Sequence, residues 1–109
     1  IESIKMSEFI DIERAGLDMK KVIDVRKPTE FETTHLDDAI NLPLDDFPNG
    51  DFSAMNVGEA YYMHCRSGFR STIASSILKK HGKGNFINVI GDFDEIKESG
   101  LLFLEPVLL

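Results

Sequence analysis

Short apolar runs alternate with amphipathic segments along the chain, and this pattern limits the folds that it can adopt. The apolar runs, which are expected to be strands, lie at 1–4, 21–26, 39–42, 60–64 and 85–90. The amphipathic segments, which are expected to be helices, run from Ser7 to about Arg14, Pro28 to about Thr34, Ser71 to His81 and Phe93 to Glu98, the last capped by Gly100. Residues 43–58 are expected to form a loop. We therefore predict an α/β fold, a small parallel sheet with helices on both faces.

The length and charge of the chain set further bounds. Its 109 residues suit one core, so residues 1–109 are expected to form a single domain. The first residue is Ile1 rather than Met, which is expected of a processed chain or of a module excised from a longer protein. A net charge of −7 argues against nucleic acid or a membrane surface as a partner. The apolar runs are too short to span a bilayer, and none has the charged-then-apolar pattern expected of a secretion signal.

Cys65 is the single cysteine of the chain. A lone cysteine excludes an internal disulfide and indicates a reducing compartment, so we expect a cytoplasmic location. Cys65 directly follows the apolar run 60–64 and precedes a helix, which is where open parallel sheets bind their ligands. An isolated cysteine at the end of a buried strand is most often only a small hydrophobic residue. The five residues that follow Cys65 favour a chemical role instead.

The loop after Cys65 is built to receive an anion. Its backbone amides can point inward as a nest, and the following helix adds the positive end of its dipole. Gly68 permits backbone angles that other residues resist, and Arg66 and Arg70 supply positive charge. We therefore predict that Cys65 is an activated nucleophile. The predicted substrate-binding residues are Arg66, Ser67, Gly68, Phe69 and Arg70.

Three motifs, in order, resemble signatures of the rhodanese family of sulfurtransferases. They are Val22–Arg26 with Glu30–Phe31 and His35–Leu44, then Cys65–Arg70, then Asn88–Gly91 with Ser99–Leu101. The sequence departs from the family at Thr34 and Asp92, where glycine is usual. It also has no Trp, which many members carry in the closing helix, and Phe93 is expected to fill the space of that side chain.

The resemblance implies a sulfurtransferase with the rhodanese fold. Cys65 would take a sulfane sulfur from thiosulfate or a persulfide, hold it as a persulfide, and pass it to a thiol or cyanide. Arg66 and Arg70 would attract the small anionic donor. No metal and no cofactor is implied.

Two other functions stay open. The chain can be a sulfur-relay or regulatory module that serves a partner protein or a covalently linked neighbouring domain. It can also be a cysteine phosphatase or arsenate reductase, which use the same thiolate and arginine. Those phosphatases place five residues between Cys and Arg, whereas four lie between Cys65 and Arg70, so the shorter loop favours a smaller reacting centre such as one sulfur atom.

Supporting roles are expected for a few residues outside the loop. Asp24 is expected to orient the loop, and Arg26 and Glu30 are expected to form an ion pair that braces the preceding turn. His64 should lie on the opposite sheet face from Cys65 and pack in the core, because side chains alternate along a strand. His35 is expected to be structural.

Other polar residues give no clear metal site. The three histidines are scattered, which gives no zinc-ligand spacing. Five acidic residues are expected to form a solvated face, and a calcium site among them stays open as an alternative. They are Asp37, Asp38, Asp45, Asp46 and Asp51.

The net charge divides unevenly along the chain. Residues 60–91 contain five lysines and arginines and no acid, so the remainder carries −12. The predicted anion-receiving loop therefore lies in a positive segment within an acidic chain.

Overall fold

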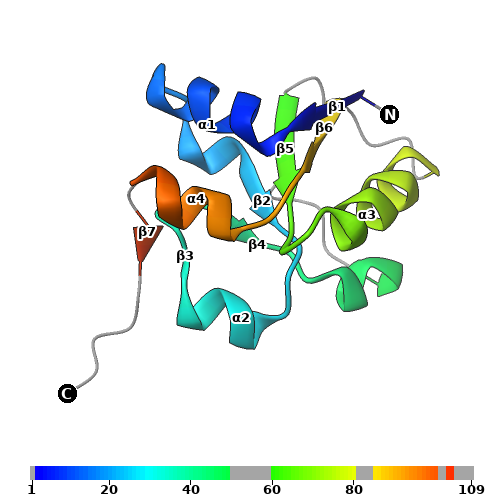
Figure 1. Cartoon of the computed structure of the whole chain (residues 1–109). Coiled ribbons are helices and arrows are strands. Elements are labelled where there is room, and N and C mark those ends of the chain that lie inside the picture. The colour runs from blue at the N-terminus through cyan, green and yellow to red at the C-terminus, as the bar shows by residue number, and fades with distance from the viewer. Residues whose placement is uncertain (1, 50–59, 81–84, 101–102, 105–109) are drawn as a thin grey trace.

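The computed structural model describes residues 2–49, 60–80, 85–100 and 103–104. Its main sheet has five strands in the order β1-β6-β5-β2-β4, and all neighbouring strands are parallel (Figure 1). These strands are β1 (Glu2–Lys5), β2 (Val22–Asp24), β4 (Ile40–Asn41), β5 (Ala60–His64) and β6 (Asn85–Ile90). The prediction of a small parallel sheet is confirmed.

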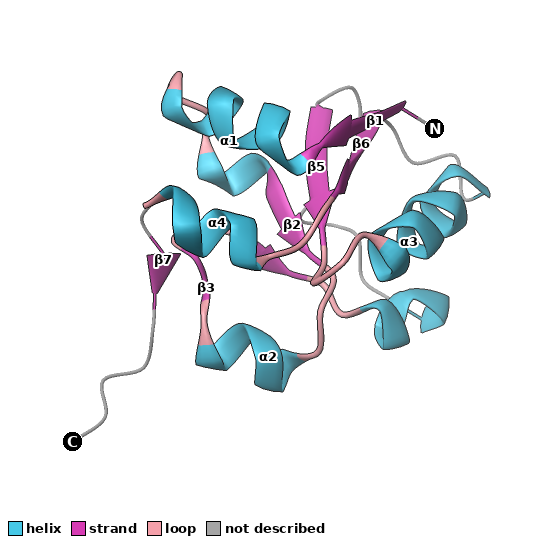
Figure 2. Ribbon diagram, in the orientation of Figure 1, coloured by secondary structure: helices cyan, strands magenta, loops and turns pink. Residues whose placement is uncertain are grey.

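Helices cover both faces of this sheet, as predicted. They are α1 (Met6–Arg14), α2 (Pro28–Thr33), α3 (Phe69–Lys80) and α4 (Asp94–Ser99), with 3-10 helices η1 (Met19–Lys21) and η2 (Leu44–Asn49). Figure 2 shows α1 and α4 on one side of the sheet and α3 on the other. No helix in the described ranges has the length and apolar content needed to cross a membrane.

Each face of the sheet buries its own hydrophobic cluster. The cluster under α1 and α4 contains Met6, Phe9, Ile10, Val22, Leu36, Val89, Phe93 and Ile96. The cluster under α3 contains Ile23, Val25, Tyr61, Met63, Cys65, Ala74 and Leu78. Alternate residues of β5 supply the two sides, because successive side chains of a strand point to opposite faces. This alternation places Cys65 in the α3 cluster, directly after the strand end.

Several element boundaries differ from the predicted ones. Helix α1 begins at Met6 rather than Ser7, and Lys5 occupies the N-cap position. Helix α3 begins at Phe69, two residues earlier than predicted, and the predicted end at His81 lies outside the described residues. The expected loop 43–58 contains η2, where Leu44 packs against the α3 cluster and so stabilises a helical turn. The rest of that loop lies outside the described residues.

A second, antiparallel sheet was not predicted. It joins β3 (His35–Leu36) to β7 (Phe103–Leu104). Strands of two residues are too short to show a hydrophobic period, so only the pairing of distant segments reveals them. Gly100 ends α4 with a left-handed backbone, φ 76°, which agrees with the predicted glycine cap.

Glu13, near the end of α1, gives the fold a pH dependence. Burial raises its pKa from 4.5 to about 7, and its Oε1 atom has no hydrogen-bond partner in the described parts of the chain. The folded protein therefore binds more protons than the unfolded chain between these values, so this residue lowers the free energy of unfolding as the pH rises through that range.

Replacing Glu13 with glutamine should remove this pH-dependent loss of stability. At pH 8 we expect Glu13→Gln to unfold with a free energy about 1–2 kcal/mol higher than the parent, after allowance for partial exposure. At pH 4.5 the two should differ little. Urea unfolding at both values tests this, with Glu32→Gln, an exposed change on α2, as the control. Equal pH dependence in the Glu13 variant and the parent would contradict the assignment.

Candidate active site

Cys65 lies at the carboxyl end of β5, where the chain turns into α3. Its side chain is buried, with 1% of its surface exposed. Gly68 has φ +94°, and a Cβ atom there would lie 3.3 Å from the Cα atom of Ile90. Glycine is therefore required at this position both by the backbone angle and by the close approach of β6. The loop passes tightly between the end of one strand and the start of the helix.

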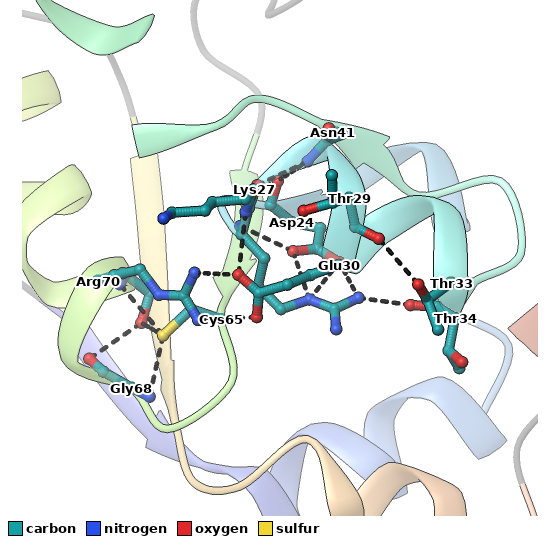
Figure 3. Close-up of polar contacts among 12 residues, drawn as sticks. Asp24, Lys27, Thr29, Glu30, Thr33, Thr34, Asn41, Cys65, Gly68 and Arg70 are labelled. Carbon is teal, nitrogen blue, oxygen red and sulfur yellow. Dashed lines mark hydrogen bonds and ion pairs between the residues drawn. The ribbon is translucent and has the colours of Figure 1, made fainter. Parts of the chain in front are cut away.

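The sulfur of Cys65 receives hydrogen bonds from two backbone amides. The N–H group of Gly68 donates to Sγ at 3.0 Å, and that of Ser71 donates at 3.4 Å (Figure 3). In the thiol form, Sγ can donate to the Ser71 hydroxyl, 3.7 Å away, and that hydroxyl donates to the Gly68 carbonyl. Amide donors and the N-terminus of α3 both stabilise negative charge on the sulfur. The site can therefore hold a thiolate or a persulfide anion.

Arg70 is held by a carboxylate rather than left free to meet a donor. Its Nη1 and Nη2 atoms donate to the two carboxylate oxygens of Glu30, at 2.5 and 3.1 Å. The hydrogen bond to Arg70 lowers the pKa of Glu30, and the same bond raises the pKa of Arg70. The predicted ion pair between Arg26 and Glu30 is therefore wrong. Glu30 instead joins α2 to the Cys65 loop.

Arg26 turns inward and pairs with Asp24. Its Nε atom lies 3.0 Å from both carboxylate oxygens of Asp24, and its Nη2 atom lies 2.8 Å from one of them and 2.6 Å from the Thr34 carbonyl. Both side chains are buried. The guanidinium also lies over the Phe93 ring, 4.0 Å from its centroid. Within the described ranges, the Asp24 carboxylate accepts hydrogen bonds from Arg26 and makes no hydrogen bond to the Cys65 loop.

The remaining loop side chains face solvent. Phe69 is 73% exposed, and Ser67 is also exposed. The Arg66 side chain is 57% exposed and lies 3.7 Å from Asp94. The Arg66 carbonyl accepts a hydrogen bond from the Phe93 amide at 2.7 Å, which fastens the loop to the start of α4. Of the two loop arginines, Arg66 therefore has the charge that is more available to an incoming anion.

His64 packs in the core, as predicted. It is fully buried and stacks on Phe93 with 5.7 Å between ring centroids. Burial lowers the pKa of His64, and neither ring nitrogen has a hydrogen-bond partner among the described residues. Its position on the face opposite Cys65 excludes direct proton transfer between the two side chains. Phe93 is buried, with 1% of its surface exposed.

His35 has a structural role, and the backbone at Thr34 can be formed without the usual glycine. The Nδ1 atom of His35 lies 2.6 Å from the Phe31 carbonyl, and the two rings stack, so a structural role is confirmed. Thr34 has an extended backbone, φ −156°, which does not require the usual glycine. Within the described ranges, no three histidine, cysteine or acidic side chains gather in a way that could hold a metal ion.

Two residues of the site were not found from the sequence. Ser71 was expected only to begin the helix, but with α3 starting at Phe69 its amide is one of the unpaired N–H groups of the first turn. An earlier helix start is the signal that would have revealed it. Glu30 was assigned to the nearer arginine, and no local pattern distinguishes Arg26 from Arg70 as its partner.

Comparison with known proteins identifies the family. A family model described as "Rhodanese-like domain" matches residues 10–99. YqhL from Bacillus subtilis, an uncharacterized protein, is 34% identical over 80 residues, which cover 73% of this chain but only 63% of YqhL.

Two further matches extend over nearly the whole chain. A protein named sulfurtransferase from Allochromatium vinosum is 28% identical over 100 residues, 92% of each chain. The crystal structure of SSP1007 from Staphylococcus saprophyticus superposes with a TM-score of 0.78 at 28% identity, covering 94% of this chain and 99% of that one. The family match, the parallel sheet and the cysteine loop agree, and the chain belongs to the rhodanese-like domain family.

Proposed function

We propose that the protein is a sulfurtransferase that carries a sulfane sulfur as a persulfide on Cys65. The observation that carries this proposal is the pair of amide hydrogen bonds, from Gly68 and Ser71, that converge on Sγ. The relative from A. vinosum that is named a sulfurtransferase supports the same class of activity. Thiosulfate or a small persulfide is the proposed donor, and a thiol or cyanide is the proposed acceptor.

The proposed reaction has two displacement steps. The Cys65 thiolate attacks the outer sulfur of thiosulfate, so a new S–S bond forms while the old S–S bond breaks, and sulfite leaves with its electron pair. The outer sulfur of the resulting persulfide is then attacked by the acceptor thiolate. The second S–S bond breaks, and its electron pair returns to Cys65 as the thiolate. Neither step needs an external oxidant or reductant.

The charges around the loop favour an anionic donor. Arg66 is largely exposed beside Cys65, whereas Arg70 is paired with Glu30. Sulfite, the leaving anion, also gains from positive charge and from the amides at the start of α3. The proposed division of roles is that Arg66 meets the donor and Arg70 holds the end of the loop against α2.

Intact-mass measurement tests the proposal directly. Incubation with thiosulfate should add the mass of one sulfur atom and release one equivalent of sulfite per chain, and cyanide should then remove the sulfur as thiocyanate. Cys65→Ala should show neither change. A parent protein that takes up no sulfur from thiosulfate or from a glutathione persulfide would contradict the proposal.

The same assay distinguishes the two alternatives. A persulfide that forms but is not discharged to cyanide or to small thiols would favour a relay module that serves a partner protein. Hydrolysis of an aryl phosphate without sulfur uptake would favour the phosphatase alternative. The loop of four residues between Cys65 and Arg70 argues against the second outcome.

A further inference from the structure

A pocket of about 340 Å³ opens between α2 and α4. It is lined on one side by Glu30 and the threonines of α2, including Thr29 and Thr33, and on the other by Phe93 and Lys97. Arg26 and Arg66 complete its wall. A volume of this size lies within the range of small-ligand sites.

The lining of the pocket has more cationic than acidic side chains, and one of the cations, Arg26, is paired with Asp24 behind the wall. Arg26, Arg66 and Lys97 line it together with one acid, Glu30, whose two carboxylate oxygens already receive hydrogen bonds from Arg70. Lys97 forms no ion pair within the described part of the chain, and Arg66 has only the 3.7 Å contact to Asp94. Positive charge in a concave site attracts small anions.

One arginine nitrogen in this wall is not used by the hydrogen bonds of the described residues. Arg26 is 4% exposed, and its Nε and Nη2 atoms are used by Asp24 and Thr34, but its Nη1 atom has no hydrogen bond in the described residues. The guanidinium is fixed in place by these bonds and by the Phe93 ring beneath it. Arg26 therefore presents the N–H groups of Nη1 from a fixed guanidinium, and these can donate to an anion in the pocket.

The α2 side adds a hydroxyl donor. The Thr29 hydroxyl has no hydrogen bond among the described residues, whereas the Thr33 hydroxyl donates to the Thr29 carbonyl. Glu30 lines the same side, and its negative charge would repel a dianion more than a singly charged group. The combination favours a carboxylate over a phosphate.

The pocket adjoins the Cys65 loop through Arg66 and Glu30. Arg66 lines the pocket and directly follows Cys65, and Glu30 lines it while bonding Arg70. In Figure 3, Glu30 lies between the loop residues Cys65 and Arg70 and the threonines Thr33 and Thr34. A small molecule with one end in the pocket therefore lies beside the loop that holds the sulfur.

We propose that this pocket binds the carboxylate of a small thiol acceptor and so selects anionic thiols over neutral ones. The carboxylate is bound by Arg26 and Lys97, and the thiol end extends past Arg66 to the Cys65 persulfide. The proposal rests on the proposed sulfurtransferase function, which it deepens by assigning the class of acceptor.

Turnover with two acceptors of similar size tests the selection. Lys97→Met should raise the KM for 3-mercaptopropionate about two- to fivefold, the size expected for one exposed ion pair. The KM for the neutral 2-mercaptoethanol should change less than twofold. Lys80→Met, an exposed lysine at the end of α3, is the matched control and should change neither. Equal changes in KM for both thiols in Lys97→Met would overturn the proposal.

A binding experiment without turnover separates this inference from the proposed function. Isotope-labelled Cys65→Ser protein is titrated with 3-(methylthio)propionate, which has the carboxylate but no free thiol. Amide NMR signals of Thr33, Phe93 and Lys97 should shift in the Cys65→Ser protein and shift less in the Cys65→Ser/Lys97→Met protein. The neutral 3-(methylthio)propanol should shift none of them.

Each outcome of the titration has a set meaning. Shifts that are absent with the carboxylate, or equal with the alcohol, would overturn the pocket assignment whether or not sulfur transfer occurs. Tighter binding of inorganic phosphate than of the carboxylate would also overturn it, because it would assign the pocket to another ligand. Carboxylate-specific shifts together with no sulfur uptake by Cys65 would support the pocket and contradict only the proposed function.

Discussion

Replacing Cys65 with serine is expected to lower the rate of sulfur transfer from thiosulfate to cyanide by at least about a thousandfold. A serine hydroxyl is a far weaker nucleophile than a thiolate at neutral pH, and it cannot form a persulfide. The hydroxyl can still accept the hydrogen bonds that Gly68 and Ser71 donate to the sulfur. The variant should therefore keep the conformation of the loop but lose sulfur transfer, and the rate of thiocyanate release measures this loss of activity.

The control for this variant is its stability. Serine is nearly the size of cysteine and keeps two hydrogen-bond donors satisfied, so the free energy of unfolding should change by only about 1 kcal/mol. Chemical unfolding of parent and variant checks this. Sulfur transfer that persists in well-folded Cys65→Ser protein would contradict the role of Cys65, because the chain contains no other cysteine to replace it.

Replacing Asp24 with asparagine is expected to lower the free energy of unfolding by about 3–5 kcal/mol. Asp24 is fully buried and is the counter-charge for the Arg26 guanidinium, which is itself only 4% exposed. The amide of asparagine is the same size as the carboxylate but carries no charge. Arg26 would be left as an uncompensated buried cation, which is one of the few changes that cost a small domain this much.

Two further variants keep this prediction testable if Asp24→Asn fails to fold. Asp24→Asn combined with Arg26→Met removes both charges, so it should recover about half of the loss or more. Asp45→Asn changes an exposed aspartate and should alter the free energy of unfolding by less than about 0.5 kcal/mol. Urea unfolding compares all three variants with the parent. A single Asp24→Asn variant as stable as the Asp45→Asn control would contradict the ion pair's importance.

Most of the fold could be predicted because its signals are local. The five strands of the main sheet show as apolar runs with charged or turn residues at their ends, and the alternation of strands and helices implied the parallel arrangement. The β3–β7 pair could not be predicted in this way. Its two strands are two residues long and lie far apart in the sequence, so their pairing depends on where α4 places the chain.

Part of the candidate site could also be predicted from the sequence, and part of it could not. The cysteine loop was predicted because the strand end, Gly68 and the helix start are consecutive in the sequence. The partner of Arg70 was not, because Glu30 precedes it by 40 residues and was predicted to pair with the nearer Arg26. Arg26 was instead drawn inward by Asp24, two residues away, and by Phe93 on the opposite end of the chain.

The sequence by itself determined the fold class, the order of the main-sheet strands and their helices, and the position of the cysteine loop. Each of these depends on residues that are close along the chain, so hydrophobic period and turn chemistry are sufficient to locate them. Only the tertiary structure decided which charges pair, which amides reach the sulfur and that a cationic pocket lies beside the loop. These depend on side chains that approach one another only after α2, α3 and α4 have packed on the sheet.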